Sequence, residues 1–115
     1  MPAPWVETIA SGLCLVARVS GDLDYLTVPV LRPQFTELFA QTGRSVVLDL
    51  SVVGFCDSVG LELLLEAWRQ ADGSGGTLFL VCVPPALQQI FQVTGVDQLL
   101  RAYDSVATAK AALRA

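Results

Sequence analysis

The sequence predicts an α/β domain with a mostly parallel, mixed sheet of roughly four to five strands and about four helices packed on it. Two short apolar runs, 45–50 and 77–83, are typical of strands that are buried on both faces. Apolar residues at helical spacing follow each run, and strands separated by helices favour right-handed parallel crossovers. The 115 residues, of which 53% are hydrophobic and 16% charged, suit a single folded core.

The N-terminal part of the chain is expected to form two strands and one helix. Residues 5–9 and 13–20 are β-rich, and the turn-forming residues Gly21-Asp22-Leu23-Asp24 end the second run. A helix follows, with Thr27 as its expected N-cap. Pro33 removes one hydrogen bond from this helix, so we expect it to start late or to bend. Its core stripe is Val30 or Leu31, with Phe35, Leu38 and Phe39.

A central strand over 45–50, a loop and a second helix over 58–71 come next. The helix carries an apolar stripe at positions i, i+3, i+4 and i+7, which we expect to face the sheet: Leu61, Leu64, Leu65 and Trp68. At about 100° per residue, Leu63 points away from this stripe. We interpret Leu63 either as an apolar contact for a partner or as a singly exposed leucine.

The C-terminal part is expected to hold a strand, a helix, a short strand and a final helix. In chain order these are 77–83, Pro84-Pro85 to Thr94-Gly95, a strand near 99–101, and a helix capped by Asp104 or Ser105. Because the carboxyl ends of parallel strands meet at one edge of a sheet, the strand-to-helix loops should lie together there. Those loops are Gly21–Asp24, Gly54–Ser58 and Val83–Pro85.

Composition narrows the classes of function. The net charge of −4 and the absence of a basic stripe argue against nucleic acid or an anionic membrane as the partner. The apolar runs are shorter than the roughly 20 residues of a membrane span, and no secretion signal opens the chain. Three widely spaced cysteines, Cys14, Cys56 and Cys82, fit a reduced, cytoplasmic protein. Without histidine, neither a zinc site nor a Ser–His–Asp triad is expected.

Ser58 stands where the loop becomes the second helix, beside unpaired backbone N–H groups that favour a phosphate. The residues alone leave open whether Asp57 or Ser58 is simply the N-cap of this helix. Asp22, Asp24 and Asp57 are interpreted as ordinary loop acids rather than as a cation site, because no series of calcium ligands is present. The sequence predicts no metal, no cofactor and no enzymatic activity.

Four motifs resemble those of the STAS-domain anti-sigma factor antagonists of bacteria. They occur in the same order as in that family and extend over nearly the whole chain, so residues 1–115 are expected to be one STAS domain. The motifs are the turn Gly21–Asp24, the central strand Val47–Ser51, the phosphorylation loop Phe55–Leu61 and the helix-to-glycine turn Phe91–Val96.

The resemblance implies that Ser58 is phosphorylated by a partner anti-sigma factor that is also a serine kinase. Phosphorylation prevents binding to that partner, and a separate serine phosphatase restores it, so that sigma-factor-dependent transcription is regulated. Val59 departs from the family pattern, which has serine or threonine there. The residues expected to bind the partner are Gly21, Asp22, Asp24, Asp57, Ser58, Val59, Gly60 and Leu63.

The acidic members of this set are expected to steer a basic patch on the partner. An alternative remains open: a STAS scaffold, or an accessory subunit of a transport system, that uses the same edge for protein binding without a phosphorylation switch. The sequence also leaves open whether the domain is a monomer or a weak dimer.

Overall fold

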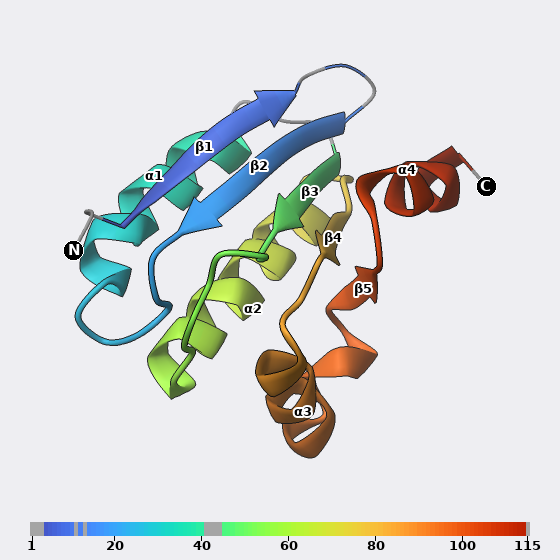
Figure 1. Ribbon diagram of the computed structural model, residues 1–115. Coiled ribbons are helices and arrows are strands. Elements are labelled where there is room, and N and C mark those ends of the chain that lie inside the picture. The colour runs from blue at the N-terminus through green and yellow to red at the C-terminus, as the bar shows by residue number, and fades with distance from the viewer. Residues whose placement is uncertain (1–3, 11, 13, 41–44, 115) are drawn as a thin grey trace.

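Five strands lie side by side in chain order in the computed structural model, which describes residues 4–10, 12, 14–40 and 45–114 (Figure 1). β1 pairs with β2 antiparallel, and the other neighbours pair in parallel. The strands are Trp5–Ala10 (β1), Cys14–Ser20 (β2), Ser45–Asp49 (β3), Leu78–Val81 (β4) and Arg101–Tyr103 (β5). The predicted α/β fold with a mostly parallel sheet is confirmed.

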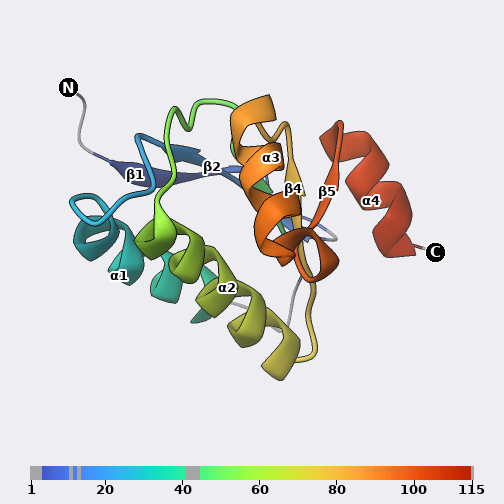
Figure 2. The same cartoon turned by 90° about the horizontal axis from the view of Figure 1, so that it is seen from below.

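The helices cover the two faces of the sheet unequally (Figure 2). Alternate strand residues such as Leu48 join a large core with α1, α2 and α3, whereas Val47 joins a smaller core under α4. The helices are Val28–Ala40 (α1), Ser58–Gly73 (α2), Pro85–Thr94 (α3) and Val106–Arg114 (α4), with a 3₁₀ turn at Val96–Gln98 (η1). Within the described ranges, no helix has the length and apolarity that crossing a membrane requires.

The structure overturns the expectation for Leu63, whose side chain is only 2% exposed and belongs to the large core. The buried face of α2 is rotated from the predicted stripe. It includes the small residues Gly60, Ala67 and Ala71, which are not part of that stripe. Leu65 and Trp68 are only partly buried. The buried residues of α2 are Gly60, Leu61, Leu63, Leu64, Ala67 and Ala71. Leu63 therefore cannot offer a surface contact to a partner.

Two smaller expectations also change. α1 begins at Val28 and contains Pro33, so the expected late start is wrong. Its buried residues include Leu31 but not Val30, which is exposed. The last strand begins at Arg101 rather than near Leu99, because Leu99 is the C-cap of η1, which ends at Gln98. The position that begins the second predicted strand, Leu13, lies outside the described residues.

Replacing Leu63 by alanine is expected to lower the free energy of unfolding by about 2–5 kcal/mol, because it removes buried methylene and methyl groups and leaves a cavity. Leu26→Ala is the matched control, since the Leu26 side chain is 68% exposed and its loss should cost less than about 0.5 kcal/mol. Urea unfolding of both variants measures the difference. Equal effects of the two substitutions would contradict the burial of Leu63.

Candidate functional site

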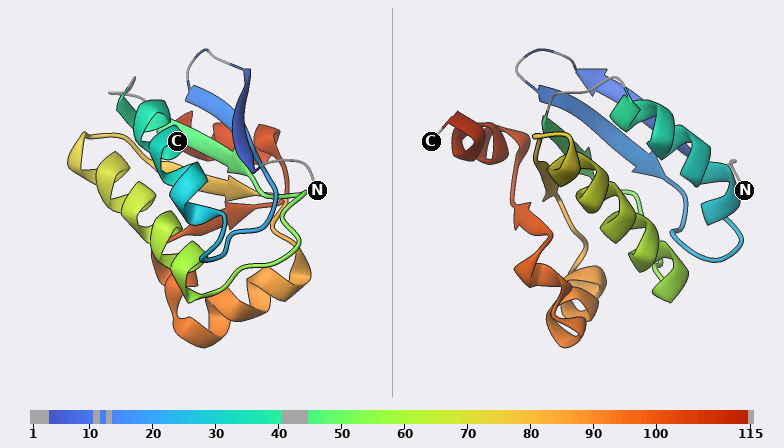
Figure 3. Two further views of the ribbon diagram at one scale, coloured as in Figure 1. Left: turned by 90° about the vertical axis from the view of Figure 1, so that its left-hand side faces the viewer. Right: turned by 180° about the vertical axis from the view of Figure 1, so that it is seen from behind.

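Two of the three predicted strand-to-helix loops are joined by backbone hydrogen bonds. The N–H of Leu23 donates to the carbonyl of Phe55 at 2.8 Å, and the N–H of Asp57 donates to the carbonyl of Leu23 at 3.0 Å. These bonds form a short parallel bridge between Leu23 and Cys56. The loop after β2 and the loop after β3 therefore run side by side to the starts of α1 and α2 (Figure 3). This confirms the expected proximity of the two loops.

Gly60 is required by this contact. A Cβ atom at Gly60 would lie 2.0 Å from the carbonyl oxygen of Leu23, far inside van der Waals contact. The first turn of α2 thus rests directly on the backbone of the other loop. Gly60 itself is buried, so the expectation that it contacts the partner is wrong, and its role is to let the two loops pack closely.

The carboxylate of Asp57 holds both loops. Its Oδ1 accepts hydrogen bonds from the N–H groups of Val59 and Gly60, both at 2.9 Å, and its Oδ2 accepts one from the N–H of Tyr25 at 3.0 Å. The hydrogen bond from Gly60, with those from Tyr25 and Val59, holds the pKa of Asp57 below its ordinary value. Asp57 is therefore the N-cap of α2 and also ties the other loop to that helix.

Asp24 and Thr27 shape the loop before α1. Asp24 Oδ1 accepts from the N–H groups of Leu26 and Thr27, each at 2.9 Å. The Thr27 hydroxyl donates to the carbonyl of Asp22 at 2.6 Å and accepts from the N–H of Asp24 at 3.0 Å. Thr27 thus precedes α1 as expected, but its hydroxyl is directed back into the loop rather than to the helix. These bonds support the interpretation of Asp24 as a structural loop acid.

Ser58 is exposed at the first position of α2, and its hydroxyl makes no hydrogen bond to another described residue. The two joined loops carry further exposed side chains, of which only Val59 belongs to the predicted partner-binding set. They are large, apolar and exposed: Tyr25 by 66%, Phe55 by 53% and Val59 by 39%, in addition to Leu26. We call these four residues, together with Ser58, the Ser58 surface. The sequence did contain a signal for this exposed surface, because large apolar residues occur in loops that are otherwise rich in turn-forming residues.

Cys56 and the third loop complete this edge of the sheet. The Cys56 side chain is 4% exposed, and burial, aided by the charge of Asp57, raises its thiol pKa to about 11. The thiol therefore stays protonated near neutral pH, which makes it a poor nucleophile.

The loop over 83–85 also leaves the carboxyl end of its strand, β4, but among the described residues it makes no hydrogen bond to the other two loops.

Residues 6–109 match the STAS domain family, and the chain belongs to that family. A relative named anti-sigma-B factor antagonist, from Staphylococcus aureus (strain NCTC 8325 / PS 47), is 26% identical over 95 residues, which cover 83% of this chain and 88% of the relative. The resemblance to STAS-domain anti-sigma factor antagonists is thus confirmed at the level of the family.

Solved structures share the fold. An anti-sigma factor antagonist from Mycobacterium paratuberculosis has a TM-score of 0.81 and 28% identity, with 96% of this chain and 95% of that chain covered. The Bacillus cell fate determinant SpoIIAA in its phosphorylated form has a TM-score of 0.68 and 21% identity, with 96% and 99% covered. The second likeness is one of fold alone.

Gly60→Ala is expected to destabilise the protein by about 2 kcal/mol or more, because its Cβ cannot be placed without moving α2 or the Leu23 loop. Gly73→Ala is the matched control: Gly73 lies in the same helix, and an added Cβ meets nothing within 4 Å. That substitution should be neutral or stabilise by up to about 1 kcal/mol. Chemical unfolding measures both, and a neutral Gly60→Ala would contradict the close approach of the two loops.

Proposed function

We propose that this protein is an anti-sigma factor antagonist that binds its anti-sigma factor through the Ser58 surface and is switched off by phosphorylation of Ser58. The anti-sigma factor is a serine kinase, and a serine phosphatase reverses the modification. Through this exchange of partners the protein regulates sigma-factor-dependent transcription in the cytoplasm. The observation that carries the proposal is an exposed Ser58 hydroxyl without a hydrogen bond to a described residue, on two joined loops that also carry exposed apolar side chains.

The Ser58 surface has the composition of a protein contact. Tyr25, Leu26 and Phe55 are each more than half exposed, and exposed large apolar side chains that gather in one place are typical of interaction sites. Aromatic residues such as Tyr25 are also enriched among the residues that dominate binding energy. Family membership and the name of the Staphylococcus aureus relative support an anti-sigma factor as the partner.

A phosphate on Ser58 would remain on the surface. The N–H groups of Val59 and Gly60, which could otherwise bind it, already donate to Asp57 Oδ1, and the N–H of Leu61 donates to the Asp57 carbonyl. The phosphate brings a charge of roughly −1.5 to −2 into an apolar contact and beside the Asp57 carboxylate. Both effects oppose partner binding while they leave the interior of the fold untouched.

Transfer of the phosphoryl group requires that the Ser58 hydroxyl lose its proton to a base. The chain contains no histidine, and the nearest carboxylate, that of Asp57, is a weak base because three N–H groups stabilise its charged form. The base must therefore come from the kinase. This protein would then supply only the acceptor hydroxyl and the kinase would supply the base, which fits a protein that is a substrate and a binding partner.

Local charge indicates what the partner surface should carry. No lysine or arginine occurs in 19–31 or in 45–61, the segments that build this edge, whereas Asp22, Asp24 and Asp57 all do. Complementary charge on the partner would be basic, which would speed association and make it sensitive to salt. The apolar side chains would then supply most of the contact.

The test is incubation of the protein with ATP and a candidate kinase-type anti-sigma factor, followed by intact-mass measurement. We expect the mass of one added phosphate, absent from Ser58→Ala and present in Ser51→Ala, which removes another exposed hydroxyl of the same loop. Phosphorylation should weaken the complex at least about tenfold, a cost of about 1.4 kcal/mol, with little change in melting temperature.

Two results would contradict the proposal. One is phosphate that persists in Ser58→Ala, which would place the acceptor elsewhere. The other is binding of the anti-sigma factor without any transfer of phosphate, which would favour a STAS scaffold without a switch. A large fall in stability on phosphorylation would contradict the argument that the switch acts on the surface and not on the fold.

A further inference from the structure

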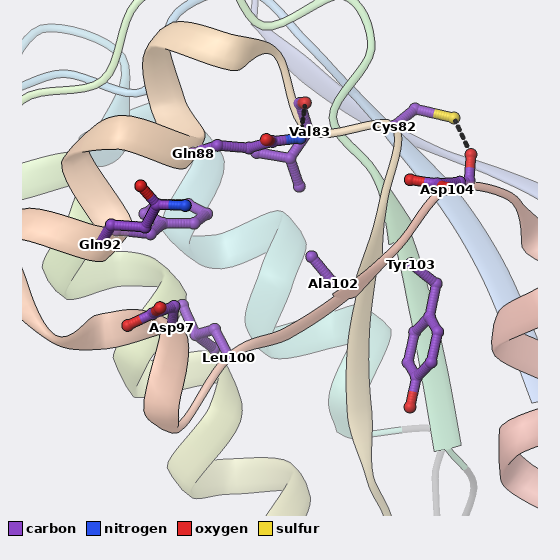
Figure 4. A pocket seen from close by; sticks show the side chains of 10 residues that line it. Cys82, Val83, Gln88, Gln92, Asp97, Leu100, Ala102, Tyr103 and Asp104 are labelled. Carbon is purple, nitrogen blue, oxygen red and sulfur yellow. Dashed lines mark hydrogen bonds between the residues drawn. The ribbon is translucent and has the colours of Figure 1, made fainter.

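The sheet has two outer strands, β1 and β5, which differ in what they offer to another chain (Figure 1). β5 has three residues, and so short an edge strand presents few backbone groups. Just after it the Cys82 thiol donates to the carbonyl of Asp104 at 3.6 Å, and a cavity of about 410 Å³ separates β5 from α3 and η1 (Figure 4). β1 has six residues and pairs only with β2 among the described residues, so its outer edge is the more exposed to pairing with another strand.

A side-chain amide from α1 occupies part of the outer edge of β1. The N–H of Val6 donates to Gln34 Oε1 at 2.7 Å, and Gln34 Nε2 donates to the carbonyl of Pro4 at 3.4 Å. The same Nε2 donates to the carbonyl of Val30, one turn earlier in α1, at 3.2 Å. Both N–H donors and the oxygen of this amide are therefore engaged. The amide binds one N–H and one C=O at this edge, the groups that a further strand would bind.

The rest of this edge has no such cover. Backbone groups of alternate residues face the partner in an antiparallel pair, so the N–H of Thr8 faces the same outer side as that of Val6. Among the described residues, no side chain other than that of Gln34 makes a hydrogen bond to the backbone of β1. Here β1 and α1 are separated by a hollow of about 260 Å³, which is lined by Val6, Thr8, Gln34, Glu37 and Leu38.

A second copy of the chain is the partner that this edge fits. β1 carries one charge, that of Glu7, and two large apolar side chains that are about half exposed, Trp5 by 53% and Ile9 by 47%. Two β1 strands related by a twofold axis would run antiparallel, so that Trp5 of one copy would approach Ile9 of the other and both would lose exposed apolar surface. The two Glu7 side chains would lie near the axis, where their like charges keep such pairing weak.

We propose that the Gln34 amide caps the outer edge of β1 and prevents two copies of the chain from pairing through this strand. Pairing requires the N–H of Val6 to exchange Gln34 for a backbone carbonyl of the second copy, so it gains no hydrogen bond at that position. The second copy also loses translational and rotational freedom, whereas Gln34 is already tethered to the same chain. The domain therefore stays monomeric. This inference does not depend on the function proposed for Ser58.

Substitution of Gln34 by alanine tests the cap. Gln34→Ala should strengthen self-association at least about tenfold in sedimentation equilibrium, because it leaves the N–H of Val6 free to bind a second copy. Gln70→Ala is the matched control, since it removes an exposed glutamine side chain of α2 and should sediment like the unaltered protein. The double variant Gln34→Ala/Thr8→Pro should be monomeric again, because proline removes an N–H that faces the second copy.

Hydrogen exchange read by NMR tests the cap in the unaltered protein. Relative to its intrinsic rate, the Val6 amide should exchange at least about tenfold more slowly than the Thr8 amide, because of the two only Val6 donates to Gln34. Three results would each overturn the proposal: Gln34→Ala as monomeric as the unaltered protein, association that persists in the double variant, and equal exchange of the two amides.

Discussion

The hydrogen bonds of Asp57 are the constraint on which this edge of the molecule depends. One carboxylate caps α2 through Val59 and Gly60 and, through Tyr25, ties down the loop that precedes α1. The backbone bridge at Leu23 fixes the spacing of the two loops, and only glycine at position 60 permits that spacing. These contacts join two loops that are far apart in the sequence. The exposed residues of the two loops therefore hold fixed positions relative to one another.

The groups that hold this edge of the fold together are distinct from the groups that we propose to bind a partner. The groups that hold the edge together, such as Leu23 and the backbone N–H groups, are buried or already hydrogen-bonded. The groups that remain for a partner are the Ser58 hydroxyl and the exposed apolar side chains around it. The proposed phosphorylation of Ser58 would therefore change this surface without disturbing the packing of the core. A helix N-terminus without an acidic cap would behave differently, since it would bind the phosphate and be stabilised by it.

The sequence was sufficient for the order of strands and helices, the central position of β3 and the proximity of two loops to Ser58, because apolar periodicity and parallel topology determine them. It failed at Leu63, where the burial of Ala67 and Ala71 rotates the buried face of α2. It also could not show the exposure of Phe55 or the cavity beside β5, since both depend on how separate elements meet. The two roles of Asp57 differ in the same way. The sequence predicts that Asp57 could be an N-cap, but it does not predict the hydrogen bond from Tyr25, because that bond depends on how the two loops meet.

The pKa of a phosphate on Ser58 tests this account most directly, because it reports the groups that surround the phosphate. Free phosphoserine has a second pKa of about 6. If the N–H groups of α2 stay with Asp57, the adjacent carboxylate should keep this pKa at or above about 6, measured by phosphorus-31 NMR across a pH titration. A pKa well below that value would mean that the helix N-terminus has bound the phosphate, and it would contradict the central place given to Asp57.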